Sequence, residues 1–366
     1  MTSHGVGMAV PDWPNTYGYN MFLFPYSQWV GGIFYEHSHR LIGSAVGLLT
    51  AILALWLWMR ETTGRVRWTG FAVVIAVLAL MGVRKMPVYV TLAALAPVVM
   101  AVALWQFKKN SGSLRWLGVT ALAAVILQGV LGGLRVVWLK DELGIFHATL
   151  AQLFFVLVCT LALMTSRWWR SNDETGAPAC GNLLTWKLGL LATILILAQL
   201  ILGATMRHQH AGLAIPDFPL AYGKIWPAMD AQSVAFYNSQ RVETMETHAI
   251  TAFQIGLQMA HRLMAMAILV CVGVVAWRAR RLAFVWLGLI FVQVALGAWT
   301  IWSNKAADVA TAHVLVGALS LVTGALWCVI AFRRPTTRTL PEAALANAHD
   351  LGSKSFEARP AGVAGE

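Results

Sequence analysis

The chain has 366 residues, of which 58% are hydrophobic and only 12% charged, and it contains 17 Trp. That composition excludes an ordinary soluble domain and indicates a helical, polytopic membrane protein, since a transmembrane β-barrel has short alternating strands instead. The formal net charge is +11, but the basic residues gather in short loops between apolar runs. We therefore expect contact with membrane lipid and no nucleic-acid partner.

The apolar runs follow one another after a polar, turn-rich start, in which we expect no cleavable signal sequence. Each run is long enough to cross a bilayer as a helix, and the second is the shortest. We expect spanning helices at about residues 37–59, 68–83, 88–107, 115–138, 146–166, 184–206, 253–277, 282–303 and 310–332. The Ala/Pro-rich tail, 333–366, is expected to be disordered. The four cysteines include no CxxC motif, and we expect no structural disulfide.

Charge in the loops predicts the orientation. Lys and Arg are frequent after the first, third, fifth, seventh and ninth runs, whereas the alternate loops are poorer in them for their length. By the positive-inside rule we expect a multi-pass protein of the cell (plasma or inner) membrane. Its N-terminus lies outside and its C-terminus in the cytoplasm, so residues 1–36 and 207–248 are the large outer segments.

An internal repeat organises the chain. "GMAVPDWPNTYG" (7–18) returns as "GLAIPDFPLAYG" (212–223), and "YEHSHRLIG" (35–43) matches "LQMAHRLMA" (257–265). A Gln-x-x-Leu-Gly motif, written QxxLG below, occurs near the outer end of three runs, beginning at Gln128, Gln199 and Gln293. The repeat predicts an all-α membrane helix bundle of two tandem four-helix-type repeats, at 1–170 and 184–332.

The two halves differ in their helices. A QxxLG run precedes the second Pro-Asp loop but not the first, so we expect the first half to lack its opening helix, through a misplaced start or a truncated gene. An extra helical hairpin at 68–107 is a candidate to cover part of the gap. Two added spans leave the topology of the following helices unchanged.

Four histidines fall at equivalent points of the halves: His39 matches His261, and His147 matches His313. We expect them at one depth, about one turn from the outer ends of their helices. Two facing imidazoles on separate helices suit bis-axial ligation of a heme iron. A polar contact between helices or a proton relay is the alternative. Zinc is less favoured, because no carboxylate or Cys completes a ligand set.

Arg40 and Arg262 follow two of these histidines directly. They either pair with heme propionates or are interfacial arginines that extend toward the headgroups. Asp12 and Asp217 of the Pro-Asp loops are expected to cap helices or bind backbone amides. The remaining outer histidines are expected to be solvated: His37, His208, His210 and His248.

Glu36 aligns with Gln258, so only the first half carries a carboxylate at this point. The difference indicates unequal roles, with a permanent electron carrier in one half and, in the other, chemistry that needs a base or a negative charge. The alternative is that Glu36 only pairs with Arg40 or His37.

The combination of Glu36-x-x-His39-Arg40, His147, His261-Arg262 and His313 resembles the heme A synthase family. The resemblance runs from about residue 3 to 332, apart from the 68–107 hairpin. It implies an oxidoreductase of cytochrome c oxidase assembly that oxidises the C8 methyl group of heme O to a formyl group, giving heme A. Some members of the family have a cysteine pair in an outer loop, which this chain lacks.

The resemblance also implies roles for residues. Glu36, His39 and His147 would form the catalytic substrate site for heme O, and His261 and His313 would ligate a heme b cofactor that carries electrons away. Heme O synthase and oxidase assembly factors would be the partners. A non-catalytic diheme cytochrome that passes electrons between quinone and a partner would need the histidines but not Glu36. A repeat-built transporter would need broken helices at mid-membrane, which the sequence does not indicate.

Overall fold

The computed structural model describes residues 9–110, 112–175, 183–241, 249–279 and 282–332. Within these ranges, nine helices are long and apolar enough to cross a membrane, as predicted. They are α1 (Gly31–Glu61), α2 (Gly64–Gly82), α3 (Met86–Lys109), α4 (Leu114–Trp138), α5 (Asp141–Thr165), α7 (Leu183–His208), α9 (Ala252–Ala279), α10 (Leu282–Trp302) and α11 (Ala307–Phe332). The predicted disordered tail lies outside the described residues.

The shorter elements were not predicted. They are helices α6 (Arg167–Thr175) and α8 (Ala231–Ser239) and the antiparallel strands β1 (Asn15–Thr16) and β2 (Tyr19–Asn20). Asp230 caps α8, because its side chain accepts from the Ser233 amide. An aspartate is a common N-cap residue, so Asp230 could have indicated the start of α8 from the sequence. The β1–β2 hairpin begins in the first Pro-Asp repeat, residues 7–18, and ends two residues beyond it.

The predicted depth of the histidines needs correction. α1 has 31 residues, a length of about 46 Å at 1.5 Å per residue, and it begins at Gly31 rather than near residue 37. His39 therefore lies roughly two turns inside its helix, and His147, His261 and His313 are also more than one turn inside theirs. In α5 and α9 the first turn contains a polar residue with a partner elsewhere in the fold: Asp141 contacts His208, and Gln254 donates to the carbonyl of Gln209.

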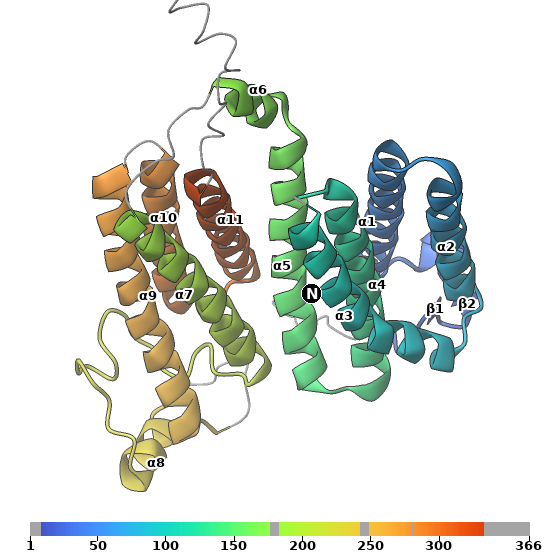
Figure 1. Cartoon of the computed structure of the whole chain (residues 1–366). Coiled ribbons are helices and arrows are strands. Elements are labelled where there is room, and N and C mark those ends of the chain that lie inside the picture. The colour runs from blue at the N-terminus through green and yellow to red at the C-terminus, as the bar shows by residue number, and fades with distance from the viewer. Residues whose placement is uncertain (1–8, 111, 176–182, 242–248, 280–281, 333–366) are drawn as a thin grey trace, which may run out of the picture.

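The second half is a closed ring of four helices. α7 packs against α9 and α11, and α10 packs against the same two helices (Figure 1). Its core surrounds Trp286 and Trp327, which are 0% and 3% exposed. Gly324 and Gly189 let these rings approach neighbouring helices, since a Cβ would lie 2.5 Å from Trp286 and 2.2 Å from Trp327 respectively.

The first half has three helices in the corresponding places. α4 packs between α1 and α5, as α10 packs between α9 and α11. The extra hairpin of α2 and α3 does not occupy the place of α7, because α3 lies along α4 and α2 lies along α1. Within the described residues, the side between α1 and α5 opposite α4 therefore has no helix equivalent to α7.

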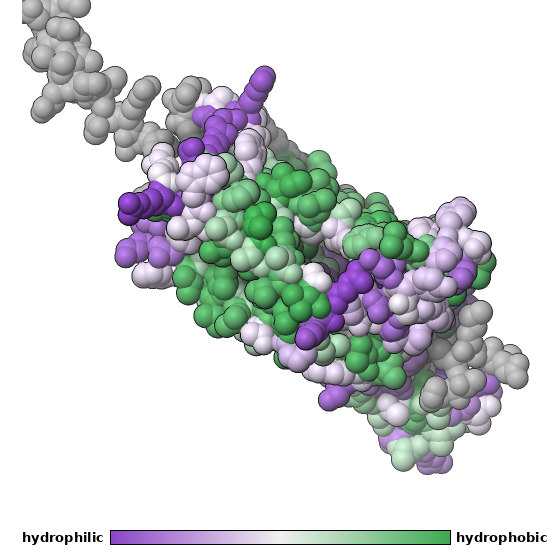
Figure 2. Space-filling model, turned by 90° about the vertical axis from the view of Figure 1, so that its right-hand side faces the viewer, coloured by the Kyte–Doolittle hydropathy of each residue, from purple (hydrophilic) through white to green (hydrophobic). Residues whose placement is uncertain are grey.

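The halves meet where α5 packs against α7 and α11, and Figure 1 shows the two groups of helices side by side, with α6 at one end of α5. On the face in Figure 2, apolar side chains gather over the middle and polar ones are more frequent toward the ends. We call the end with the Pro-Asp loops and α8 the loop end. Cys159, Cys271 and Cys328 are free thiols, and Cys180 lies outside the described residues.

Candidate functional site

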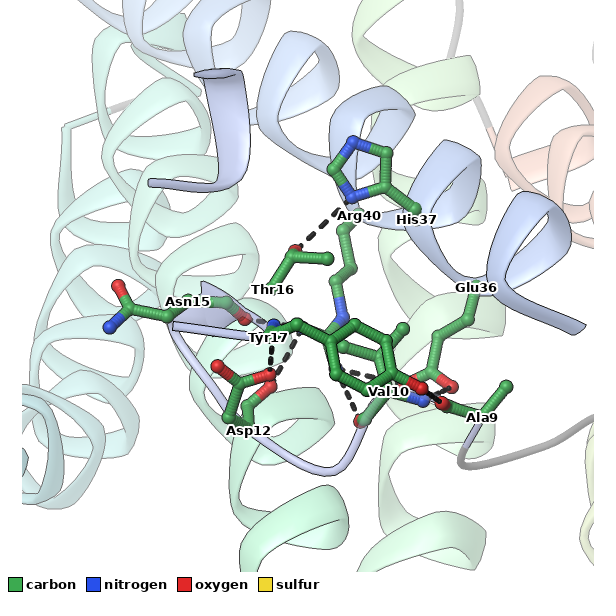
Figure 3. A network of polar contacts seen from close by, with 9 residues as sticks. All are labelled: Ala9, Val10, Asp12, Asn15, Thr16, Tyr17, Glu36, His37 and Arg40. Carbon is green, nitrogen blue, oxygen red and sulfur yellow. Dashed lines mark hydrogen bonds and ion pairs between the residues drawn. The ribbon is translucent and has the colours of Figure 1, made fainter. Parts of the chain in front are cut away.

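The first Pro-Asp loop is held to α1 by Glu36 and Arg40, which form a buried ion pair with each other on that helix (Figure 3). Arg40 Nη2 lies 2.9 Å from Glu36 Oε1, and both side chains are almost fully buried. The second Glu36 oxygen accepts from the Val10 amide at 3.0 Å. The Arg40 guanidinium also donates to the carbonyls of Val10, Asp12 and Asn15. These contacts fix the loop against the helix that carries the first predicted ligand.

The aspartates bind backbone amides, as predicted. Asp12 accepts from the amides of Tyr17 and Gly18, at 2.8 and 2.7 Å. Asp217 accepts from the amide of Tyr222 at 2.7 Å and from that of the following glycine. Gly18 has φ +78°, a conformation that glycine adopts without strain. The two loops therefore repeat in their hydrogen bonds as well as in their sequence.

A tyrosine closes each loop through its hydroxyl group. Tyr17 donates to the carbonyl of Ala9, and Tyr222 donates to the carbonyl of Ala214. Burial is the main cause that raises the pKa of Tyr222 to about 12. At neutral pH its hydroxyl is therefore protonated and able to donate this bond.

The second loop is anchored in the same way but without a carboxylate. Gln258 Oε1 accepts from the amide of Ile215 at 2.7 Å, which is the counterpart of the contact that Glu36 makes. Arg262 donates to the carbonyls of Leu220 and Asp217 at 2.8 and 2.6 Å. Thus the Glu36-to-Gln258 difference keeps the acceptor for the loop amide, while it removes the negative charge and the ion pair with the arginine.

These contacts bear on the predicted roles of two arginines. The guanidinium groups of Arg40 and Arg262 bind loop carbonyls, an arrangement that neither sequence alternative included. The ion pair between Glu36 and Arg40 is the structural alternative stated above. Placement of Glu36 at the reacting edge of a heme remains a prediction.

The predicted histidine pairs lie together. The ring centres of His39 and His147 are 6.3 Å apart, and those of His261 and His313 are 6.5 Å apart. Each pair joins two helices that lie on opposite sides of a third, α4 or α10. His39 is exposed, whereas the other three are partly buried. That exposure agrees with the side of the first half where the described residues provide no fourth helix.

The QxxLG motif holds a histidine of a neighbouring helix. The Gln128 side chain donates to the carbonyl of His147 at 3.0 Å, and that of Gln199 donates to the carbonyl of His261 at 2.9 Å. Gln293 Nε2 lies 3.4 Å from His313 Nε2. The motif glycine leaves room for the ring, because a Cβ on Gly132 would lie 2.9 Å from His147. Sequence reasoning found the motif but not this role.

The ring separations fit a metal with two axial imidazoles. A metal–imidazole bond is about 2 Å and each ring centre lies roughly 1 Å behind its nitrogen, so opposed ligands place their centres about 6 Å apart. His147 Nδ1 lies 3.1 Å from the carbonyl of Gln128. That contact requires hydrogen on Nδ1, so Nε2 carries the lone pair that a metal would need. In this structure Nε2 lies 3.4 Å from Gln128 Nε2. The residues present therefore fit a heme iron, and ligation itself remains a prediction.

Two histidines expected in solvent are buried. His37 is 0% exposed and its Nδ1 lies 3.2 Å from Thr16 Oγ1, against the rings of Phe24 and Trp29. His208 is 8% exposed, because α7 continues past residue 206. Polar partners outside the apolar runs, which sequence periodicity does not reveal, explain both errors. His210 is exposed, and His248 lies outside the described residues.

Together the fold and the histidines define a multi-pass membrane protein of two related helix bundles, each with a facing imidazole pair. The chain belongs to the cytochrome oxidase assembly protein family, whose sequence profile matches residues 84–325. The matched range contains His147, His261 and His313. It does not reach Glu36 or His39.

Several relatives carry the name heme A synthase. The chain is 30% identical to one from Caulobacter sp. (strain K31) over 215 residues, 54% of this chain and 57% of the relative. It is 25% identical to one from Listeria monocytogenes serotype 4a (strain HCC23) over 252 residues, 66% and 75% of the two chains. A relative from Beijerinckia indica is 26% identical over 277 residues, 73% and 62% of the two chains. The alignments thus span less than two thirds of the Caulobacter and Beijerinckia relatives.

Proposed function

We propose that this chain is an oxidoreductase that converts heme O to heme A, by oxidising the C8 methyl group of heme O to a formyl group. One observation carries the proposal: both halves place two imidazoles at a separation suited to one iron, 6.3 and 6.5 Å between ring centres. Family membership supplies the reaction class.

Two sites with different roles follow from the repeat. His39 and His147 hold heme O as substrate in the first half, and His261 and His313 hold heme b in the second. When bound, heme b supplies a one-electron redox centre through which electrons leave. Gln128 and Gln199 orient two of these ligands by binding their backbone carbonyls.

Glu36 gives the first site its negative charge. The carboxylate interacts electrostatically with His39, and its counterpart in the second half is neutral. Its oxygens bind Arg40 and the Val10 amide, and we propose that it lies in the wall of the first site. We propose that this charge favours the transition state of methyl oxidation, which the electron-carrier half does not need.

The cellular setting follows from charge and chemistry. We infer from the positive-inside pattern that the loop end faces away from the cytoplasm. The membrane concerned is the cell membrane. Heme O is apolar and membrane-bound, so a heme O synthase in the same membrane is the proposed donor. Assembly factors of cytochrome c oxidase are the proposed receivers of heme A.

Pigment analysis tests the activity. The full chain is co-expressed with a source of heme O, and hemes extracted from the membranes are separated by chromatography. We expect heme A and its hydroxylated intermediate. Unchanged heme O together with a fully heme-loaded protein would contradict the proposal and favour the diheme electron carrier.

A further inference from the structure

A cluster of basic side chains, two arginines and a histidine, lies at the loop end, where the two halves meet. Arg135 lies in the last turn of α4, and Arg207 and His208 are the last two residues of α7. Arg135 and His208 both lie on Gly144 of α5, since a Cβ there would be 2.9 Å from Arg135 Nε and 2.4 Å from His208 Cε1. Arg207 interacts electrostatically with Arg135. Each half thus contributes positive charge to one small volume.

The carboxylate of the cluster is already engaged. Asp141 Oδ1 lies 3.3 Å from His208 Nδ1. Among the residues that the structure describes, no carboxylate forms an ion pair with Arg135, and its charged neighbours include the cation Arg207. A guanidinium in such a positive environment is suited to an external anion, and a carboxylate matches its planar pair of donors.

The position of Arg135 relates it to the first imidazole pair. Gln128, Gly132 and Arg135 share one face of α4, at helical spacings of four and three residues. The first two contact His147, and Arg135 lies about one turn beyond Gly132 on the same face. Arg135 is thus about 4.5 Å farther along the axis than Gly132, toward the loop end. A porphyrin bound to His147 has its acidic edge within reach of Arg135 if that edge faces the polar end.

We propose that Arg135, and not Arg40, binds a carboxylate arm of the porphyrin in the first half. The inference rests on the proposed function, because it requires a heme at His39 and His147. Arg40 donates to three loop carbonyls and pairs with Glu36. Arg135 instead belongs to the basic cluster, which attracts anions. The equivalent position of α10 is Thr300, so this cation belongs to the first half.

Esterified heme provides the test. The purified full chain carries His313→Ala, so that the first half supplies the site, and it is titrated with iron protoporphyrin IX and with its dimethyl ester. We expect the parent to bind the free acid about tenfold or more tightly than the ester, as is usual for a charge-assisted contact. Arg135→Gln should remove most of that preference. Arg84→Gln, a charge loss elsewhere, should retain it.

Arg40→Gln separates the two arginines: the inference expects a folded variant to keep the acid-over-ester preference. A preference that survives Arg135→Gln, or that is lost in Arg40→Gln alone, would overturn it. Equal binding of acid and ester by the parent would overturn it as well, while leaving the proposed function in place. Failure of the parent and of the chain with native His313 to bind either porphyrin would contradict both. Heme content of Arg135→Gln isolated from heme-producing cells gives a second reading, and we expect it to be lowered.

Discussion

Glu36 and Gln258 show how one position can keep its structural contact while changing its charge. Each accepts a backbone amide of its Pro-Asp loop, from Val10 and Ile215 respectively. Arg262 still donates to carbonyls of the second loop, although the residue four positions before it is the neutral Gln258. The second half therefore serves as an internal control for removing the carboxylate from the first.

Glu36→Gln should separate anchoring from chemistry. Glutamine can still accept from the Val10 amide, so we expect the variant to fold and bind heme, with some stability lost with the Arg40 ion pair. Formation of heme A should fall about a hundredfold, within the range for a positioned acid or base. Chromatography of extracted hemes gives conversion, and absorbance gives heme content. Normal conversion by this variant would make Glu36 a loop anchor only.

Gln128 orients the ligand predicted for the first site. It binds the carbonyl of His147, and its own carbonyl accepts from the His147 ring. Loss of such a contact typically lowers metal affinity 10- to 100-fold. We expect Gln128→Leu to lower heme affinity in the first half by about tenfold, with Gln199→Leu affecting only the second. Spectral titration measures both, and equal effects on both halves would contradict separate sites.

At the scale of elements, the nine membrane helices were predictable because apolar length alone decides a membrane span. The ends of these helices at the loop end were not predictable from apolar length. There the helix includes polar residues whose hydrogen-bond and ion-pair partners lie far away in the sequence. Glu36 and Arg40 have the spacing of neighbours on a helix, and their pairing was foreseen as an alternative. The loop carbonyls that Arg40 binds lie 25 to 30 residues earlier, beyond the reach of local pattern.

Close helix packing gives a prediction about the second half. A Cβ on Gly324 of α11 would lie 2.5 Å from Trp286, whereas one on Gly288 of α10 would meet nothing within 4 Å. Gly324→Ala should destabilise the bundle by about 1–3 kcal/mol through overpacking. Gly288→Ala should be neutral or slightly stabilising. Unfolding in detergent measures the difference, and equal behaviour of the two variants would contradict the packing described.

On the scale of the whole molecule, duplication provides two similar sites whose walls differ. The second half encloses its imidazole pair with four helices, while the described residues of the first half provide three. His39 is correspondingly the exposed member of the four. The repeat made the pairing of histidines predictable, but the position of the hairpin along α4 required the structure.

The central claim is that each half ligates one heme through its own pair of imidazoles. The most direct measurement is the number of hemes per chain, with low-spin iron signals, in the native chain, His147→Ala and His313→Ala, each purified from cells that supply heme O. The account predicts two hemes in the native chain. His147→Ala should lose the first-half heme and His313→Ala the second-half heme, each keeping the other. A native chain with a single heme that only one of these variants removes, or unchanged signals in both variants, would contradict it.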